Sequence, residues 1–159
     1  MGRKKHLGGK AANHESRKLF IIDIENYCGK PVLTEEDVAA AKDGIAKEFG
    51  LAPSDLVVIG TSHTSNLMSA GFAWRSARQV IMHGHDGADE ALLKAVEDYK
   101  IDSFAEVYVM SGDGIFADLV ERLANSGVAV TVASIQRCLS RKLSAAAPRV
   151  QIVAEHAAA

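Results

Sequence analysis

Carboxylates and other polar side chains follow several short apolar segments of the chain, near the point where each segment ends. Asp23 follows the first segment, Asp89 follows a later one after a short loop, and Asp113 follows a third. Carboxylates gathered in one place repel each other, and the pKa of each rises unless a cation lies among them. Mg²⁺ and Mn²⁺ prefer such oxygen ligands. A cation of this kind polarises a phosphoryl oxygen and activates water, which is the chemistry of phosphate-ester hydrolysis.

The apolar segments that must position these acids read as strands alternating with helices. We predict strands at 19–22, 56–60, 79–82, 107–110, 128–132 and 150–153, and helices at 34–49, 66–73, 88–99, 116–123 and 140–147. Short apolar strands that alternate with helices predict an α/β fold, a three-layer α/β/α sandwich with a mainly parallel central sheet. In such sheets the ligand site lies outside the carboxyl ends of the strands, where the acids are expected.

The length and charge pattern predict one folded domain behind a basic arm. The chain has 159 residues, 48% of them hydrophobic, and a net charge of −2. Residues 1–17 are rich in Lys, Gly and His with few large apolar side chains, so we expect a disordered basic arm that suits a polyanion. We expect the domain at 18–154 and a short tail at 155–159.

Several classes of protein are disfavoured by composition. The two cysteines are too few for a disulfide framework. No apolar stretch is typical of a signal peptide or a transmembrane helix, so we expect a cytoplasmic protein with no membrane partner. The first strand is followed by Asp-Ile-Glu-Asn-Tyr instead of a glycine-rich turn, which argues against a dinucleotide cofactor. Homo-oligomerisation is left open.

Three segments together resemble the NYN domain family of the PIN-like nuclease superfamily. Residues 19–27, LFIIDIENY, are similar to the opening motif of the family, an apolar strand followed by Asp and then Asn. Residues 87–92, GADEAL, resemble its Gly-x-Asp helix start. Residues 109–116, VMSGDGIF, resemble its Ser-Gly-Asp-x-Asp-Phe signature. The match covers about residues 18–135 and implies a PIN-like fold and a Mg²⁺- or Mn²⁺-dependent endoribonuclease.

The resemblance implies roles for individual residues. Asp23, Asp89 and Asp113 would bind the metal, and Asn26 would orient a water or a phosphate oxygen. The second acid of the last family motif falls on Ile115 here, so one carboxylate is missing, and restoring it is expected to raise activity. Auxiliary carboxylates that could stand in or support the site are Asp86, Asp118 and Glu25.

Basic and polar side chains outside the acidic motifs are candidates for contacts with RNA. Arginines and a lysine after the second and fifth strands could follow a nucleic-acid backbone, and two further polar residues could add contacts. The predicted substrate-binding set is His63, Asn66, Arg75, Arg78, Arg137, Arg141 and Lys142.

Two other functions compete with the ribonuclease hypothesis. Because a fold does not determine a function, the same domain could bind RNA without cleaving it, with Ile115 as a sign of lost activity. A phosphatase of the haloacid dehalogenase type is the other, since Asp23 ends a strand and Asp113 and Asp118 imitate the last acidic motif of that family. Its first motif is matched poorly, because Glu25 and Tyr27 replace the expected Asp and Thr.

Overall fold

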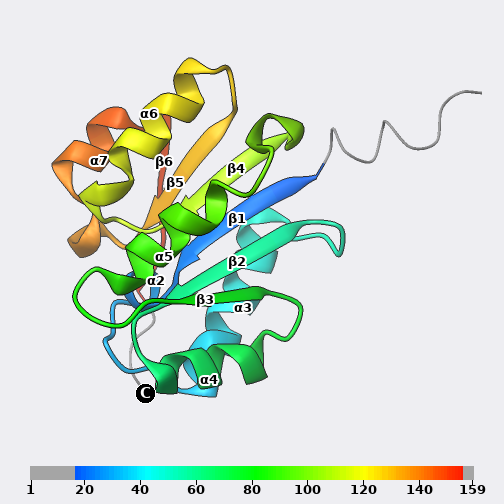
Figure 1. Cartoon of the computed structure of the whole chain (residues 1–159), viewed down its shortest axis with the longest axis vertical. Helices are drawn as coiled ribbons and strands as arrows, with labels where there is room; N and C mark the ends of the chain where they lie inside the picture. The colour runs from blue at the N-terminus through cyan, green and yellow to red at the C-terminus, as the bar shows by residue number, and fades with distance from the viewer. Residues whose placement is uncertain (1–16, 156–159) are drawn as a thin grey trace, which may run out of the picture.

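The computed structural model describes residues 17–155, which form one six-stranded parallel sheet between two layers of helices (Figure 1). The predicted arm and tail lie almost wholly outside the described residues. The strand order is β3-β2-β1-β4-β5-β6, and every neighbouring pair is parallel. The strands are β1 (Lys18–Asp23), β2 (Leu56–Thr61), β3 (Arg78–Ile81), β4 (Glu106–Met110), β5 (Val130–Ser134) and β6 (Arg149–Ile152).

The central strands are buried on both faces because a helix layer covers each face. On β1, Phe20 and Ile22 belong to one apolar core, whereas Leu19 and Ile21 belong to the other. The edge strands β3 and β6 are more exposed. The continuous apolar runs of β1, β2, β4 and β5 are thus explained by burial on two sides.

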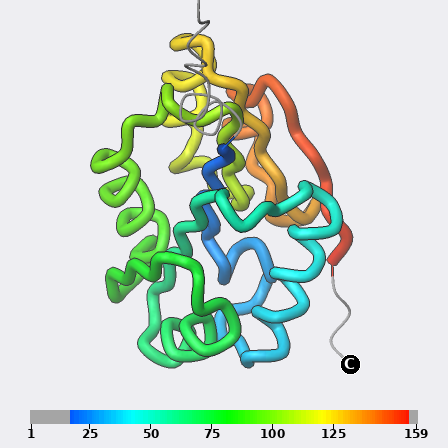
Figure 2. Tube along the Cα trace, turned by 90° about the vertical axis from the view of Figure 1, so that its right-hand side faces the viewer, coloured from blue at the N-terminus to red at the C-terminus, as the bar shows by residue number. Residues whose placement is uncertain are grey.

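Helices α3 (Glu35–Phe49) and α4 (Thr64–Ala73) pack on one face of the sheet, and α5 (Gly87–Val96), α6 (Ala117–Asn125) and α7 (Arg141–Ala146) pack on the other. Figure 1 shows α5, α6 and α7 in front of the sheet with α3 behind it, and Figure 2 shows β1 between α5 and α3. The change of face follows from right-handed crossovers, because the chain moves outward from β1 to β3 and then crosses back to β4.

The sandwich and its parallel sheet confirm the predicted fold class. Short 3₁₀ segments, η1 (Ile101–Ser103), η2 (Gly114–Phe116) and η3 (Gln136–Cys138), interrupt the loops. The predicted strand at 128–132 begins two residues later, and α5 ends at Val96 instead of Tyr99. The sequence patterns missed helix α2 (Ile24–Cys28), which begins at an Asp23 cap and ends at Gly29 in the left-handed conformation.

Within residues 17–155, no helix is long and apolar enough to cross a membrane. The cytoplasmic location stays a prediction.

Arg17 lies at the amino end of β1, where its carbonyl oxygen accepts a hydrogen bond from Ala105 N at 2.9 Å and its guanidinium lies 5.4 Å from the Phe104 ring centroid. Arg17 therefore contacts the folded domain.

Candidate metal centre

An open pocket of about 300 Å³ lies at the carboxyl edge of the sheet. It is centred where the sheet order changes direction, between the ends of β1 and β4. Loops leave adjacent strands toward opposite faces at such a switch point, and the resulting crevice is the usual ligand site of open α/β sheets. Side chains from β1, α2, the loop before α5, and the loops after β2, β4 and β5 line the pocket.

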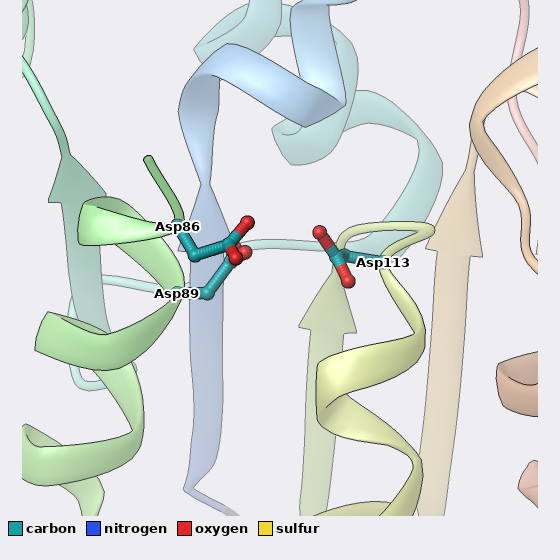
Figure 3. Close-up of side chains that lie close together, drawn as sticks. All are labelled: Asp86, Asp89 and Asp113. Carbon is teal, nitrogen blue, oxygen red and sulfur yellow. The ribbon is translucent and has the colours of Figure 1, made fainter. Parts of the chain in front are cut away.

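Three aspartates converge at this pocket, and Figure 3 shows Asp86 and Asp89 pointing toward Asp113 across the end of β1. One carboxylate oxygen from each lies within 4.8 Å of the other two. Asp86 caps the start of α5, Asp89 follows in its first turn, and Asp113 follows β4. Asp86, which was predicted as an auxiliary acid, is thus a full member of the cluster.

The carboxylate of Asp23 lies beneath this cluster and is almost wholly buried, with 4% of the residue exposed. Its Oδ2 accepts a hydrogen bond of 3.0 Å from the Ser111 hydroxyl, and it is also hydrogen-bonded to Asp89. The Ser111 oxygen in turn accepts a bond of 3.2 Å from Asp113 N. A chain of hydrogen bonds therefore links Asp23 with the two aspartates that the sequence motifs predicted beside it.

Burial and mutual repulsion perturb the titration of the acids. Burial, together with contacts with Asp23 and Asp113, raises the pKa of Asp89 to about 10. Burial also raises the pKa of Asp23, although the hydrogen bonds from its neighbours oppose the rise. Without a cation, Asp23 and Asp89 therefore share a proton at neutral pH. A cation that replaced this proton would relieve the repulsion, as the sequence analysis expected.

Asn26 fastens the turn after β1 to the loop after β4. Its Oδ1 accepts a hydrogen bond of 2.9 Å from Gly112 N, and its own N–H donates to Asp23 Oδ1 at 3.4 Å. Because Oδ1 is occupied and the residue lines the pocket, Nδ2 is the polar atom that it can offer to a ligand. A donor at this position suits a phosphate oxygen.

Glu25 lines the same pocket but its carboxylate is occupied by protein donors. Ser62 donates to it from both backbone and hydroxyl, at 2.9 and 2.7 Å for the shorter contacts, and Asn66 Nδ2 donates at 2.6 Å. Asn66 also accepts from Leu33 N at 2.9 Å. These contacts join α2, α4 and the end of β2, so Glu25 and Asn66 act as a structural clamp behind the aspartates.

We predict that Gly112→Ala destabilises the protein by about 2–4 kcal/mol, because the site needs close backbone approach there. A Cβ at this position would lie 2.2 Å from the carbonyl oxygen of Cys138 and 2.5 Å from Ser134 Oγ. The strain would also break the bond from Gly112 N to Asn26. Urea unfolding measures the effect.

The matched control is Gly71→Ala on α4, where no heavy atom lies within 4 Å of the added Cβ. In this helical variant the free energy of unfolding is expected to rise by roughly 0.5–1 kcal/mol. If Gly112→Ala and the wild type unfolded at the same urea concentration, the close approach of these loops would have no energetic importance.

Ile115 and Asp118 do not complete the acidic cluster. Ile115 is half-buried and packs against the core on the α5–α7 face. Asp118 is exposed on α6, and the pocket is lined by other residues. The position where the resembled family carries its second acid therefore faces the core here, which speaks against the expected gain in activity. Asp86 has a carboxylate oxygen within 4.8 Å of oxygens of Asp89 and Asp113.

We predict that Ile115→Asp lowers the unfolding free energy by about 1–3 kcal/mol, because a carboxylate would enter an apolar contact without a partner. Thermal melts with and without Mn²⁺ test this, with Ile115→Val as a control that keeps the apolar contact. A variant that melted like the wild type and bound Mn²⁺ more tightly would show that position 115 faces the metal.

The predicted substrate-binding residues divide into one that lines the pocket and several that lie elsewhere. Arg137 lines the pocket. Asn66 is wholly buried and structural, whereas His63 is exposed before α4. Arg78 begins β3 at the opposite edge of the sheet and donates to Tyr99 at 2.6 Å, and Arg75 lies beside apolar side chains of α4. Arg141 and Lys142 are exposed in the first turn of α7.

Two polar residues of the site were not assigned by the sequence analysis. Ser111 is wholly buried and bridges Asp23 and Asp113, and Ser62 binds Glu25. Ser111 belongs to the Ser-Gly-Asp segment, so that motif was the available signal. For Ser62 the available signal was its place after the second strand, but its contact with Glu25 depends on the packing of α2 against the end of β2.

Comparison with known proteins places the chain by fold alone. No family model matches it, and no curated protein shows significant similarity. Among solved structures, it is similar to the crystal structure of a protein of unknown function from Vibrio parahaemolyticus RIMD 2210633, with a TM-score of 0.58 and 18% identity. The match covers 93% of this chain and 97% of that chain. The two proteins therefore share their fold over nearly their whole lengths.

Proposed function

We propose that the protein is a divalent-metal-dependent hydrolase that cleaves phosphodiester bonds of RNA. The observation that carries the proposal is the cluster of Asp86, Asp89 and Asp113, with carboxylate oxygens within 4.8 Å of one another and Asp23 hydrogen-bonded beneath them. A cation among these acids would relieve their mutual repulsion.

The donor set fits a hard divalent cation. All the donors are carboxylate oxygens, which suit Mg²⁺ and Mn²⁺. Asp86, Asp89 and Asp113 would hold the cation, and Asp23 would orient Asp89 through their hydrogen bond. When bound, the cation would neutralise phosphate charge and activate water for hydrolysis.

RNA is proposed as the substrate from the resemblance of three acidic segments to NYN domains. Phosphodiester hydrolysis demands positioning and charge neutralisation and needs little other chemistry from the protein. Asn26 offers an amide donor in the pocket, and the openness of the pocket at the sheet edge suits a strand that passes across it. Because the pocket is open, we expect the protein to cleave RNA and not a small phosphate ester.

The geometry favours this function over the two alternatives. A phosphatase that forms a phospho-aspartate needs a nucleophile open to attack, but Asp23 is 4% exposed and its carboxylate is engaged by Ser111 and Asp89. Loss of activity through Ile115 is also disfavoured, because Asp86 supplies a third carboxylate.

The test incubates the full chain with single-stranded and structured RNA in Mn²⁺, in Mg²⁺ and in chelator, while Mn²⁺ binding is measured by calorimetry. We expect binding of the metal and cleavage that chelator abolishes. Mn²⁺ binding with RNA binding but no cleavage would select the non-catalytic module. A protein that bound no divalent metal would overturn the proposed function.

A further inference from the structure

Two positively charged side chains also line the pocket. Lys30 and Arg137 line it together with the acids, Lys30 from the loop after α2 and Arg137 from η3. Lys30 is already paired with Asp37, its Nζ lying 2.8 Å from Oδ1. Arg137 is the second cation of the pocket, and its planar guanidinium can present several donors to a ligand.

The guanidinium of Arg137 is fixed by contacts with two other segments. Nε donates to Glu155 Oε1 at 2.7 Å, and Nη2 is ion-paired with the same oxygen. Nη2 also donates to the carbonyl oxygen of Gly29 at 2.8 Å. These contacts join η3 to the end of α2 and to the segment after β6, and they orient a guanidinium that is otherwise exposed.

The donor inventory leaves one nitrogen for a ligand. Arginine has five N–H groups; Nε donates to Glu155, Nη2 donates to Gly29, and Nη2 is also ion-paired with Glu155. Nη1 lies 3.9 Å from Cys138 Sγ, which is a weak acceptor. Because Glu155 accepts from the Nε side of the guanidinium, it orients that group without covering Nη1.

We propose, on the basis of the function proposed above, that Arg137 binds a non-bridging oxygen of a substrate phosphate through Nη1 and that Glu155 is its positioning residue. A phosphate group carries several oxygens, so one can face the aspartate-held cation while another faces the guanidinium. The aspartates and the arginine line the same pocket, which matches this division. The ligand class is thus a phosphate ester whose phosphate contacts both the cation and the guanidinium, while its sugar and base contact neither.

Inorganic phosphate is the probe, titrated into the full chain in Mn²⁺ and, separately, in chelator, with binding followed by calorimetry. Arg137→Ala is expected to weaken phosphate binding at least about tenfold, as expected for loss of a charged hydrogen bond. Arg137→Lys should recover only part of the affinity, because a lysine cannot be held by the same fork. Mn²⁺ affinity should stay within about twofold, since Arg137 carries no metal-binding oxygen.

Glu155 is tested through rescue by a conservative variant. Glu155→Gln keeps an oxygen acceptor and is expected to retain most of the phosphate affinity, whereas Glu155→Ala releases the guanidinium and should weaken binding several-fold. With RNA as substrate, Glu155→Ala should raise KM more than it lowers kcat. Arg75→Ala is the matched control, because that arginine is exposed on the α4 surface away from the pocket.

The outcomes separate this role of Arg137 from the proposed function. Unchanged phosphate affinity in Arg137→Ala, or equal losses in Arg75→Ala, would overturn the role of Arg137 while Mn²⁺ binding upheld the metal site. Failure of the wild type to bind Mn²⁺ would overturn the proposed function, and the titrations in chelator would still decide whether phosphate binding depends on Arg137. Absence of phosphate binding in both conditions would also overturn the role of Arg137.

Discussion

Replacing Asp113 with Asn is expected to lower metal-dependent RNA cleavage by at least about 100-fold while the protein stays folded. The substitution removes a charged oxygen from the cluster with Asp86 and Asp89. The fold should survive because Asp113 Oδ1 accepts its 3.0 Å bond from Ile115 N, and an Asn side-chain oxygen can accept the same bond. Cleavage assays and thermal melts on the same preparation measure the two effects.

Asp118→Asn is the matched control, since it removes a carboxylate from the exposed start of α6 outside the pocket lining. It is expected to cleave RNA at the wild-type rate. Unimpaired turnover by a well-folded Asp113→Asn protein would contradict the assignment of this cluster as the metal site.

Replacing Asp89 with Asn is expected to stabilise the metal-free protein at pH 7.5 while abolishing its stabilisation by Mn²⁺. Burial, together with contacts with Asp23 and Asp113, raises the pKa of Asp89 to about 10, far above the usual range of an aspartate. The folded protein therefore retains a proton that the unfolded chain releases, and the unfolding free energy falls as pH rises above about 4. An amide does not titrate, so the Tm of Asp89→Asn should exceed that of the wild type by more as pH rises. The difference should reach several degrees, at about 2–4 °C per kcal/mol.

Thermal melts from pH 5 to pH 9 in chelator check this pH dependence, with the exposed neighbour Glu90→Gln as control. Addition of Mn²⁺ should raise the Tm of the wild type and of Glu90→Gln, because the cation binds only the folded state. Parallel pH profiles for Asp89→Asn and the wild type would show that Asp89 gains no proton on folding.

The fold was predictable because its signals are local and agree with one another. The runs at 19–22, 56–60 and 107–110 are long enough to fill a strand and too apolar for a surface, so they predicted buried parallel strands. The placement of Asp23 and Asp113 at the carboxyl edge followed, because both come directly after such strands. The edges of the sheet were less predictable, since β3 and β6 are half-exposed and their patterns are weak.

The parts of the site that escaped prediction depend on packing between distant segments. A polar residue after a strand can face a ligand or hold a loop, and its type does not distinguish the two. Asn66 followed the second strand and was expected to contact substrate, but the packing of α4 buries it against Glu25 and Leu33. Arg78 was expected to follow a nucleic-acid backbone because it lies between the second and third strands, yet it begins β3, and in a parallel sheet the strand starts lie at the end opposite to the pocket.

The crossing from β3 back to β4 has a consequence for the order of folding. The aspartates of the pocket come from both sides of that crossing, from Asp23 before it to Asp113 after it. The pocket therefore forms only after β4 pairs with β1, a contact between segments more than 80 residues apart. Before that pairing, a cation that needs all these acids has no complete site. Because the cation would bind only after that pairing, it would slow unfolding of the native state without speeding folding.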